Sequence, residues 1–496
     1  MEVSEIVSSS CRRLSWLVMG LVVLGAPAHS ATDTVLILYT NDFHDHIRAG
    51  YGGVGGMPYV SGYIRSAARG RKDALILDAG DVMEKGDMLA FQTQSRVMYE
   101  AMGRIGYHAG VMGNHDGAYG IPHLKACAAL AGYDLLCLNL VAPDGTRPLP
   151  ASTVLDVDGV KVGIVGLLTE KDYTLPLAES VRLLADEAAR LDEQAHLVVA
   201  VCHLGSGPCR AISPEAPAVD VFVSGHTHEA LREPRIVDET GAIIVQAGRY
   251  AQYVGRLEVT LDLDTEAILR TKGELVEMQH DAVPCDRAME AWIQEQEQAL
   301  CPEADRVVGR THQALGQVEV ARLAAAALRE RAGADVGFCH SAKVMRSGLP
   351  AGCIDVNALF LTGGQRGHTI VSVDLAGKDI VNYLNDLAAR NNGRTQWSGF
   401  RATSETSTSR VRTYTTDLQP ERMYKVVLPK REWDSYLRPL LARQGRPHDA
   451  AQCAFTFTEA FADYAAALTE RGCRLQQRAE DLARAQDGAP AALHTE

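Results

Sequence analysis

The chain has 496 residues, of which 46% are hydrophobic and 22% are charged. This balance excludes a disordered or fibrous protein and suits two or three packed domains. The net charge of -13 argues against a protein that binds a nucleic-acid polymer, because such binding depends on Lys and Arg that neutralise phosphates.

The first 30 residues are typical of a signal peptide. Arg12 and Arg13 precede an apolar run from Leu14 to Gly25, and small residues follow it up to Ser30. Because the run is short for a membrane span, we expect cleavage near residue 30, no stable membrane insertion afterwards, and a periplasmic or secreted protein. A retained anchor is the alternative interpretation.

Ten cysteines follow this leader, an even number that is compatible with disulfides in an oxidising compartment. Two pairs are close in sequence and flank stretches with a helical pattern. These first candidates are Cys285 with Cys301 and Cys453 with Cys473, and the sequence leaves the true connectivity open.

Residues 31–285 alternate apolar runs with Ala- and Leu-rich stretches. The runs "TVLILYT", "DALILDAG", "HLVVAVCH" and "VDVFVSGH" are continuously apolar, as expected for strands that are covered on both faces. This pattern predicts a layered α/β domain. Residues 286–305 predict a connecting amphipathic helix, and residues 306–475 predict a second, smaller α/β domain. We expect the polar tail, residues 476–496, to fray.

Five strand ends in the first region carry side chains that bind metals. They lie in the segments "NDFH", "GD", "GNHD", "CH" and "GHTH", which supply Asp42, His44, Asp81, Asn114, His203, His226 and His228. The carboxyl ends of parallel strands meet at one edge of a sheet, so we expect these groups to converge.

This set is large enough for two divalent ions about 3.5–4 Å apart, the separation used for in-line displacement at phosphorus. Alternate residues of an extended segment share a face, so Asp42 can reach one ion together with His44, and His226 can point into the same cleft as His228. Nitrogen and oxygen ligands without thiolate favour zinc, manganese or iron over calcium or magnesium.

Each of these signals also has a structural interpretation. An isolated His-x-His is more often a surface or structural feature, and an Asp after a strand is most often a helix N-cap. Five such elements in succession, each after a buried strand, favour a metal site over coincidence.

The order of these segments resembles the calcineurin-like metallophosphoesterases, and the wider context resembles the secreted 5'-nucleotidase and UDP-sugar hydrolase family. The resemblance implies a four-layer β-sandwich flanked by helices, followed by the smaller substrate-binding domain. It implies that Asp42, His44, Asp81 and His228 hold one ion, and that Asp81, Asn114, His203 and His226 hold the other. A water activated by the two ions would then attack phosphorus.

The resemblance also implies that His115 stabilises or protonates the departing oxygen. Family members usually carry an acidic residue three positions after this histidine, which orients its ring, but here that position is Ala118. Asp116 or a carboxylate distant in sequence would have to take that role.

In the second domain the resemblance implies contacts to the rest of the substrate. Arg346 matches an arginine of the family, Arg390 or Arg394 would contact a phosphate or carboxylate, and Trp397 and Phe400 are candidates for stacking on a base. A core position in a strand is the alternative for these two aromatic residues.

We therefore expect a secreted enzyme that hydrolyses a small phosphate monoester, first of all a 5'-nucleotide. The same site could act on a nucleotide-sugar, a cyclic phosphodiester or a sulfur-linked substrate like that of the thiosulfohydrolases. A metal-stabilised binding protein without activity is the third interpretation. The sequence does not determine the oligomeric state.

Overall fold

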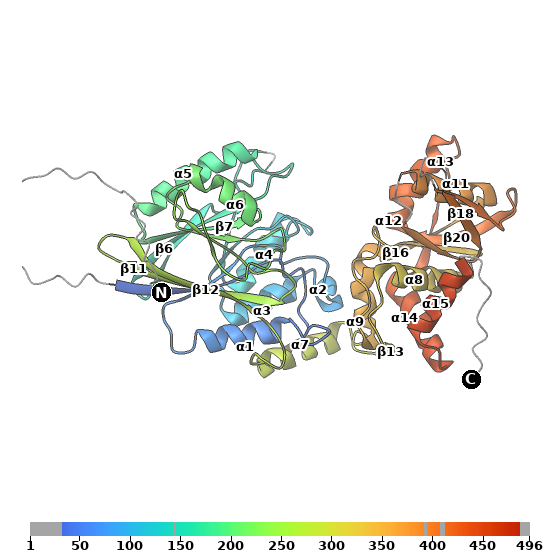
Figure 1. Ribbon diagram of the computed structural model, residues 1–496, viewed down its shortest axis with the longest axis horizontal. Coiled ribbons are helices and arrows are strands. Elements are labelled where there is room, and N and C mark those ends of the chain that lie inside the picture. The colour runs from blue at the N-terminus through green and yellow to red at the C-terminus, as the bar shows by residue number, and fades with distance from the viewer. Residues whose placement is uncertain (1–31, 143, 391–393, 407–411, 487–496) are drawn as a thin grey trace, which may run out of the picture. The chain divides into compact units, whose positions relative to one another are not determined.

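The computed structural model describes residues 32–142, 144–390, 394–406 and 412–486. The chain divides into two compact units, Met1–Gly86 with Ala90–Glu295 and Asp87–Leu89 with Gln296–Glu496 (Figure 1). The expected signal peptide lies outside the described residues. Within them, no helix combines the length and the apolar character needed to span a membrane.

The first unit contains two six-stranded sheets. One has the order β12-β11-β1-β2-β3-β4, formed by β1 (Thr32–Thr40), β2 (Ala74–Asp78), β3 (Ala109–Val111), β4 (Asp134–Leu136), β11 (Tyr253–Asp262) and β12 (Ala267–Glu277). The other has the order β5-β6-β7-β8-β10-β9, formed by β5 (Ser152–Val157), β6 (Val160–Leu168), β7 (Leu197–His203), β8 (Val221–Ser224), β9 (Arg235–Ile236) and β10 (Ile243–Gln246). The strands β1 to β4 are parallel to one another, as are β6, β7, β8 and β10.

The helices of this region lie outside the two sheets. They are α1 (Met57–Ala67), α2 (Met88–Gln92), α3 (Arg96–Ile105), α4 (Ile121–Ala131), α5 (Leu177–Asp192) and α6 (Ser206–Ile212). Figure 1 shows α5 and α6 on one side of the sandwich and α1 on the opposite side. The predicted four-layer β-sandwich flanked by helices is therefore confirmed.

The continuous apolar runs follow from this layering. In β7, Val199 and Val201 lie in the core between the two sheets, whereas Val198 and Ala200 lie in the core beneath α5 and α6. Successive side chains of a strand point to opposite faces, and here both faces are buried.

Helix α7 (Arg287–Leu300) leads into the second unit, which has a five-stranded sheet of order β17-β14-β20-β16-β21. Its strands are β14 (Val336–His340), β16 (Thr369–Ala376), β17 (Thr395–Ser398), β20 (Met423–Pro429) and β21 (Ala451–Thr456). Two small sheets pair β13 (Val307–Thr311) with β15 (Gly352–Asp355) and β18 (Ala402–Thr406) with β19 (Arg412–Thr416). The predicted second α/β domain is confirmed.

Its helices are α8 (Gln317–Ala332), α9 (Val356–Leu359), α10 (Gln365–Gly367), α11 (Gly377–Ala389), α12 (Lys430–Glu432), α13 (Arg438–Arg443), α14 (Phe457–Glu470) and α15 (Leu475–Gln486). Strand β21 ends at Thr456 because this residue caps α14. The Thr456 side chain accepts a hydrogen bond from the Glu459 backbone, and the Glu459 carboxylate accepts one from the Thr456 backbone.

Two expectations are corrected by the structure. Residues 476–486 belong to the tail that is expected to fray, but they form most of α15. This helix is ordered because Leu475, Ala479 and Leu482 are buried. The ten cysteines of the described residues are free thiols, so neither Cys285 with Cys301 nor Cys453 with Cys473 forms a disulfide.

Candidate metal centre

The predicted metal ligands converge from both sheets of the first unit. Asp42 follows β1 and Asp81 follows β2, while His203 ends β7 and His226 follows β8. The sequence predicts that these side chains meet at one edge of a single sheet. The structure instead brings the carboxyl ends of two facing sheets together, which allows ligands far apart in the sequence to meet.

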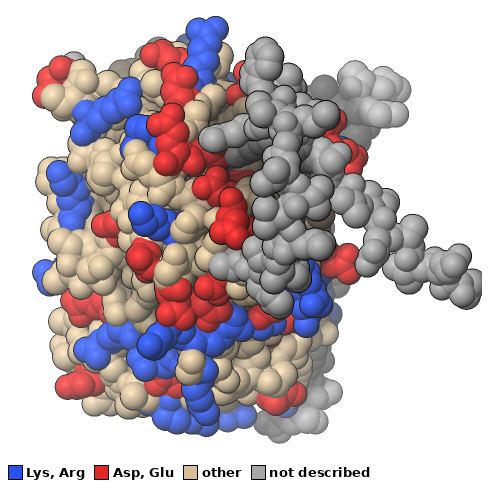
Figure 2. Space-filling model, turned by 90° about the vertical axis from the view of Figure 1, so that its left-hand side faces the viewer, with Lys and Arg blue, Asp and Glu red and all other residues tan. Residues whose placement is uncertain are grey.

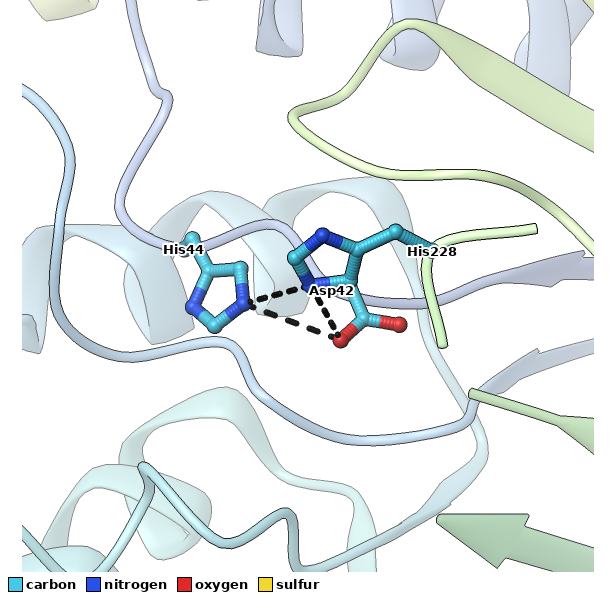
Figure 3. Close-up of side chains that lie close together, drawn as sticks. All are labelled: Asp42, His44 and His228. Atoms are coloured by element: carbon cyan, nitrogen blue, oxygen red, sulfur yellow. Dashed lines mark hydrogen bonds and ion pairs between the residues drawn. The ribbon is translucent and has the colours of Figure 1, made fainter. Parts of the chain in front are cut away.

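Asp42, His44 and His228 form the first ligand group (Figure 3). Nε2 of His228 lies 3.2 Å from Oδ1 of Asp42 and 3.1 Å from Nε2 of His44. The side chains of Asp42 and His44 are fully buried. Three ligand atoms therefore face one point, as the coordination of a single cation requires.

Asp81, His203 and His226 form the second group. Oδ2 of Asp81 lies 3.1 Å from Nε2 of His203, and the same oxygen lies 3.6 Å from Nε2 of His44 in the first group. Asp81 is thus within reach of both groups, which is the geometry of a carboxylate shared between two cations.

The D-x-H and H-x-H segments are not extended, contrary to the sequence interpretation. Asp42 and His44 have φ angles of 53° and 48°, and His226 and His228 have φ angles of 78° and 59°. Residues other than glycine seldom adopt this left-handed region, and such residues cluster at functional sites. Tight loops, not a strand pleat, turn each pair of side chains toward the centre.

The remaining polar atoms of the ligands are held by the protein. Oδ2 of Asp42 accepts hydrogen bonds from the Asn41 amide and from the backbone of His226. Nδ1 of His203 lies 2.7 Å from the carbonyl oxygen of Ala79, to which it donates, and this leaves Nε2 directed at Asp81. Such partners fix the orientation of a metal ligand and, for histidine, its tautomer.

Three candidate ligand atoms are buried without a hydrogen-bond partner among the described residues. They are Oδ1 of Asp42, Oδ1 of Asn114 and Nε2 of His203. The 3.1 Å contact between His203 and Asp81 has an ion-pair distance but not hydrogen-bond geometry. Because an unpaired buried polar atom is costly, three of them at one place fit a site that binds cations.

The charges of the site compensate one another in the absence of cations. Burial lowers the pKa of His203, but the neighbouring Asp81 carboxylate outweighs it and raises this pKa to about 9. Burial raises the pKa of Asp81, yet the charges of His203 and His44 bring it below its usual value. A bound cation would take the place of the His203 proton, so we expect cation binding to release protons.

His115 lies beside this cluster, with its ring 5.1 Å from the His44 ring and nearly perpendicular to it. Its backbone N–H donates to Oδ1 of Asp81 over 2.7 Å. Its Nδ1 lies 2.5 Å from Oε2 of Glu84, a residue in the loop that follows β2. Glu84 is not among the residues predicted from the sequence, although it lies only three positions after Asp81.

The carboxylate of Asp116 binds the backbone of neighbouring loops and not the ring of His115. Its buried carboxylate accepts backbone hydrogen bonds from Gly113, Asp81 and Met83, at 2.6 to 3.0 Å. Burial and the charge of Asp81 raise its pKa to about 6. Asp116 therefore connects the loops that follow β2 and β3 instead of orienting His115.

The close approach of the loops that follow β2 and β3 requires glycine at position 113. A Cβ atom at this position would collide with the backbone nitrogen and the Oδ1 atom of Asp81. The glycine of "GNHD" thus allows the two loops to approach closely enough for His115 and Asp81 to share a hydrogen bond.

In the second unit, the two aromatic residues predicted to stack on a base belong to the core. Trp397 and Phe400 are each 8% exposed, and their rings stack on each other with centroids 5.7 Å apart. Trp397 also packs edge-on against Tyr414, and Phe400 packs edge-on against Phe338. The structure therefore favours the core interpretation for both rings.

The arginines predicted to contact substrate have different surroundings in the second unit. Arg390 ends α11 at the surface and forms an ion pair with Asp386 over 2.9 Å. Arg346 follows β14 and is half-buried, and its backbone N–H donates to the carbonyl of Thr362. The exposed Arg394 accepts hydrogen bonds from Ser341 through its carbonyl oxygen.

A hollow of about 440 Å³ in the second unit has a cationic lining that the sequence analysis did not find. Its lining residues are Lys343, Gln365, Arg366, His368, Thr369, Lys430, Arg431, Asp434 and Ser435. Lys430 forms an ion pair with Asp434.

Comparisons with known proteins agree with this architecture. Residues 35–230 match the model of the calcineurin-like phosphoesterases, and residues 297–430 match that of the 5'-nucleotidase C-terminal domain. The crystal structure of a 5'-nucleotidase precursor from Thermus thermophilus superposes with a TM-score of 0.64 at 24% identity, covering 88% of this chain and 97% of that one. This likeness shows a shared fold.

Among curated proteins, a 5'-nucleotidase of Vibrio parahaemolyticus is 24% identical over 440 residues, which is 73% of this chain and 77% of that protein. Endonuclease YhcR of Bacillus subtilis is 23% identical over 399 residues, which is 70% of this chain. The chain spans only 32% of the length of YhcR. The two matches, in this order, show that the chain combines a calcineurin-like phosphoesterase domain with a 5'-nucleotidase C-terminal domain.

Proposed function

We propose that this protein is a two-cation phosphoesterase that hydrolyses small phosphate monoesters, with 5'-nucleotides as the first candidate substrates. The observation that carries the proposal is the position of Asp81, whose Oδ2 lies within 3.6 Å of a histidine nitrogen in each ligand group. A shared carboxylate of this kind is what a site for two neighbouring cations needs.

In this proposal Asp42, His44, Asp81 and His228 hold one divalent cation, and Asp81, Asn114, His203 and His226 hold the other. When bound, the two cations supply Lewis acidity that activates a water molecule and offsets the charge of the phosphoryl group. The ligand set contains nitrogen and oxygen atoms only, which favours zinc, manganese or iron. His115, beside the ligands, is the group that meets the departing oxygen.

The choice of nucleotides rests on the second domain. That domain matches the 5'-nucleotidase C-terminal model, and the Vibrio parahaemolyticus relative is named a 5'-nucleotidase. Since Trp397 and Phe400 stack on each other in the core, they do not support a base clamp. A nucleotide substrate would therefore have to be recognised by other groups.

A second candidate is a diphosphate substrate such as a nucleotide-sugar. The cationic lining of the hollow in the second unit favours it, because side chains such as Lys343 and Arg431 are of the kind that binds phosphate. If so, the double replacement of Lys343 and Arg431 by Ala would raise KM for a nucleotide-sugar more than for a nucleoside monophosphate. Equal KM changes for both would count against the hollow as a phosphate site.

The proposal includes a periplasmic or secreted location, which rests on the leader-like residues 1–30. N-terminal sequencing of the mature protein after cell fractionation tests this part. A new N-terminus near residue 31 in the periplasm or medium would support export, and an intact N-terminus in the cytoplasm would contradict it.

The activity is tested by elemental analysis together with steady-state hydrolysis, with and without added Mn²⁺ or Zn²⁺. The substrates are nucleoside monophosphates, nucleotide-sugars, cyclic phosphodiesters and a simple aryl phosphate. Two cations per chain with turnover of monoesters support the proposal. Two cations without turnover of any ester would instead favour a metal-stabilised binding protein.

A further inference from the structure

We propose that Glu84 is the positioning residue of His115, in a chain where Ala118 cannot supply the orienting acid. The inference rests on the proposed phosphoesterase function, because it assigns Glu84 a role in the cleavage of the ester. Glu84 comes from the loop after β2, whereas Ala118 lies beyond β3 in the same segment as His115.

The contact between the two side chains is close and partly shielded. Nδ1 of His115 lies 2.5 Å from Oε2 of Glu84, and the two side chains are 27% and 29% exposed. The backbone of His115 is also held, since its N–H donates to Asp81. The backbone and the ring of His115 thus each have a partner beside the candidate metal ligands.

The loop places Glu84 without relying on its carboxylate. The backbone N–H of Glu84 donates to Oδ2 of the buried Asp45 over 2.7 Å, and the residue has a φ angle of 67°. Asp45 also accepts a hydrogen bond from Ser95. A change of the Glu84 side chain leaves these backbone contacts available, so variants at this position are suited to functional tests.

Asp116, the other carboxylate of the segment, is not a substitute for Glu84. Its two oxygens accept hydrogen bonds from three backbone N–H groups, of Gly113, Asp81 and Met83. These bonds turn it toward the backbone of the neighbouring loops. Glu84 is the carboxylate that the structure brings to Nδ1 of His115.

The geometry assigns the two ring nitrogens of His115 to different tasks. Nδ1–H donates to Glu84, and Nε2 is left to face the departing oxygen. When water adds to phosphorus, the bond from phosphorus to the ester oxygen breaks and its electron pair stays on that oxygen. The proton on Nε2 passes to this oxygen and leaves a neutral imidazole, and the proton released by the water restores the imidazolium through solvent. The carboxylate of Glu84 stabilises the charged ring.

The role of Glu84 is tested by comparing two leaving groups. The oxygen that departs from an alkyl phosphate needs a proton. The 4-nitrophenolate that departs from 4-nitrophenyl phosphate is weakly basic and leaves without one. We expect Glu84→Ala to lower kcat for the alkyl phosphate by about 100-fold and for the nitrophenyl ester by less than about fivefold, with KM little changed. An equal loss for both esters would overturn the proposal, because it would indicate general damage to the site.

Further variants separate the hydrogen bond from the charge. Glu84→Gln keeps an acceptor for Nδ1–H, so we expect its kcat to lie between those of the wild type and Glu84→Ala. In a His115→Ala background, Glu84→Ala should have almost no additional effect, since the two residues act as a unit. Additive losses would contradict the proposal. Glu187→Ala removes a similar half-buried, ion-paired carboxylate of the same unit and serves as the matched control.

A measurement without substrate distinguishes this proposal from the proposed function. In the full-length protein with ¹⁵N-labelled histidine, assigned with His115→Ala, Nδ1 of His115 should carry a proton, and its signal should change in Glu84→Ala but not in Glu187→Ala. If the wild type hydrolyses no ester but shows this pattern, the proposed function fails while the positioning contact stands. If Nδ1 of His115 is unchanged in Glu84→Ala, the positioning role is wrong even in an active enzyme.

Discussion

The two units of the molecule differ in how their candidate residues are placed. In the first unit, Asp42 and Asp81 lie in loops that meet at one cluster with His203 and His228. In the second unit, Trp397 is in the core and Arg390 forms an ion pair at the surface. The difference teaches that polar residues at the ends of several buried strands are together a strong signal, because the structural role open to each of them singly does not explain five in succession. An aromatic ring in a strand has an obvious structural role and is a weak signal.

The largest effect is expected at the shared carboxylate of the first unit. Asp81→Asn removes the charge that both ligand groups use, so we expect the protein to lose at least one cation per chain and its hydrolysis rate to fall at least about 100-fold. Elemental analysis and steady-state kinetics on the same preparation measure this. Full activity with two cations per chain in Asp81→Asn would contradict the contrast between the two units, because the cluster of the first unit would then not be a catalytic centre.

The counterpart in the second unit is Trp397→Ala, which tests whether a predicted site residue is only structural. Removal of this buried ring should lower the free energy of unfolding by about 3–5 kcal/mol and leave KM for nucleotides unchanged in the folded protein. Thermal unfolding and kinetics below the transition measure both quantities. A raised KM with unchanged stability would restore the stacking interpretation of this ring.

We expect a smaller loss of stability when Asp116 is replaced. This variant tests whether the Asp116 carboxylate supports the metal site through the structure of the loops. Asp116→Ala leaves the buried backbone N–H groups of Gly113, Asp81 and Met83 without their acceptor. We expect unfolding to become easier by about 3 kcal/mol and cation affinity to weaken. Urea unfolding and metal titration check this. A stable variant with unchanged cation affinity would show that the loops do not depend on this carboxylate.

An effect confined to a range of pH concerns a buried carboxylate in the second unit. Burial raises the pKa of Glu432 to about 7 from its ordinary value of 4.5, although Tyr383 and Thr395 donate hydrogen bonds to it. Between pH 4.5 and pH 7 the folded protein binds this proton more tightly than the unfolded chain does. The contribution of Glu432 to stability is therefore greatest at low pH and is lost as the pH rises toward 7, at no more than about 1.4 kcal/mol per pH unit.

Glu432→Gln keeps the acceptor for Tyr383 and removes this titration. The variant and the wild type should have similar unfolding free energies near pH 4.5, and the variant should be the more stable protein at pH 8. Unfolding curves across this range check the sign. A wild type whose stability rises relative to Glu432→Gln between pH 5 and pH 7 would contradict the assignment.

Figure 2 bears on the class of substrate. On the face that it shows, basic side chains lie next to acidic ones and do not form a field of one sign. With a net charge of -13 for the chain, this agrees with the expectation of a small-molecule substrate and not a nucleic-acid polymer.

The sequence by itself determined the layered α/β architecture and the identity of the candidate metal ligands. Continuous apolar runs require strands buried on both faces, and a polar residue directly after such a run must emerge at the end of the sheet. These are local consequences of burial, so no knowledge of distant contacts was needed to reach them.

Only the tertiary structure decided which residues meet. The contact of Glu84 with His115, the burial of Phe400 against Phe338, and the packing of α15 all depend on side chains that are distant in sequence or on loops with left-handed residues. Hydrophobic periodicity contains no information about such loops, since their φ angles are imposed by contacts with neighbouring loops. For that reason the candidate ligands could be named from the sequence, while the carboxylate beside His115 had to be found in the fold.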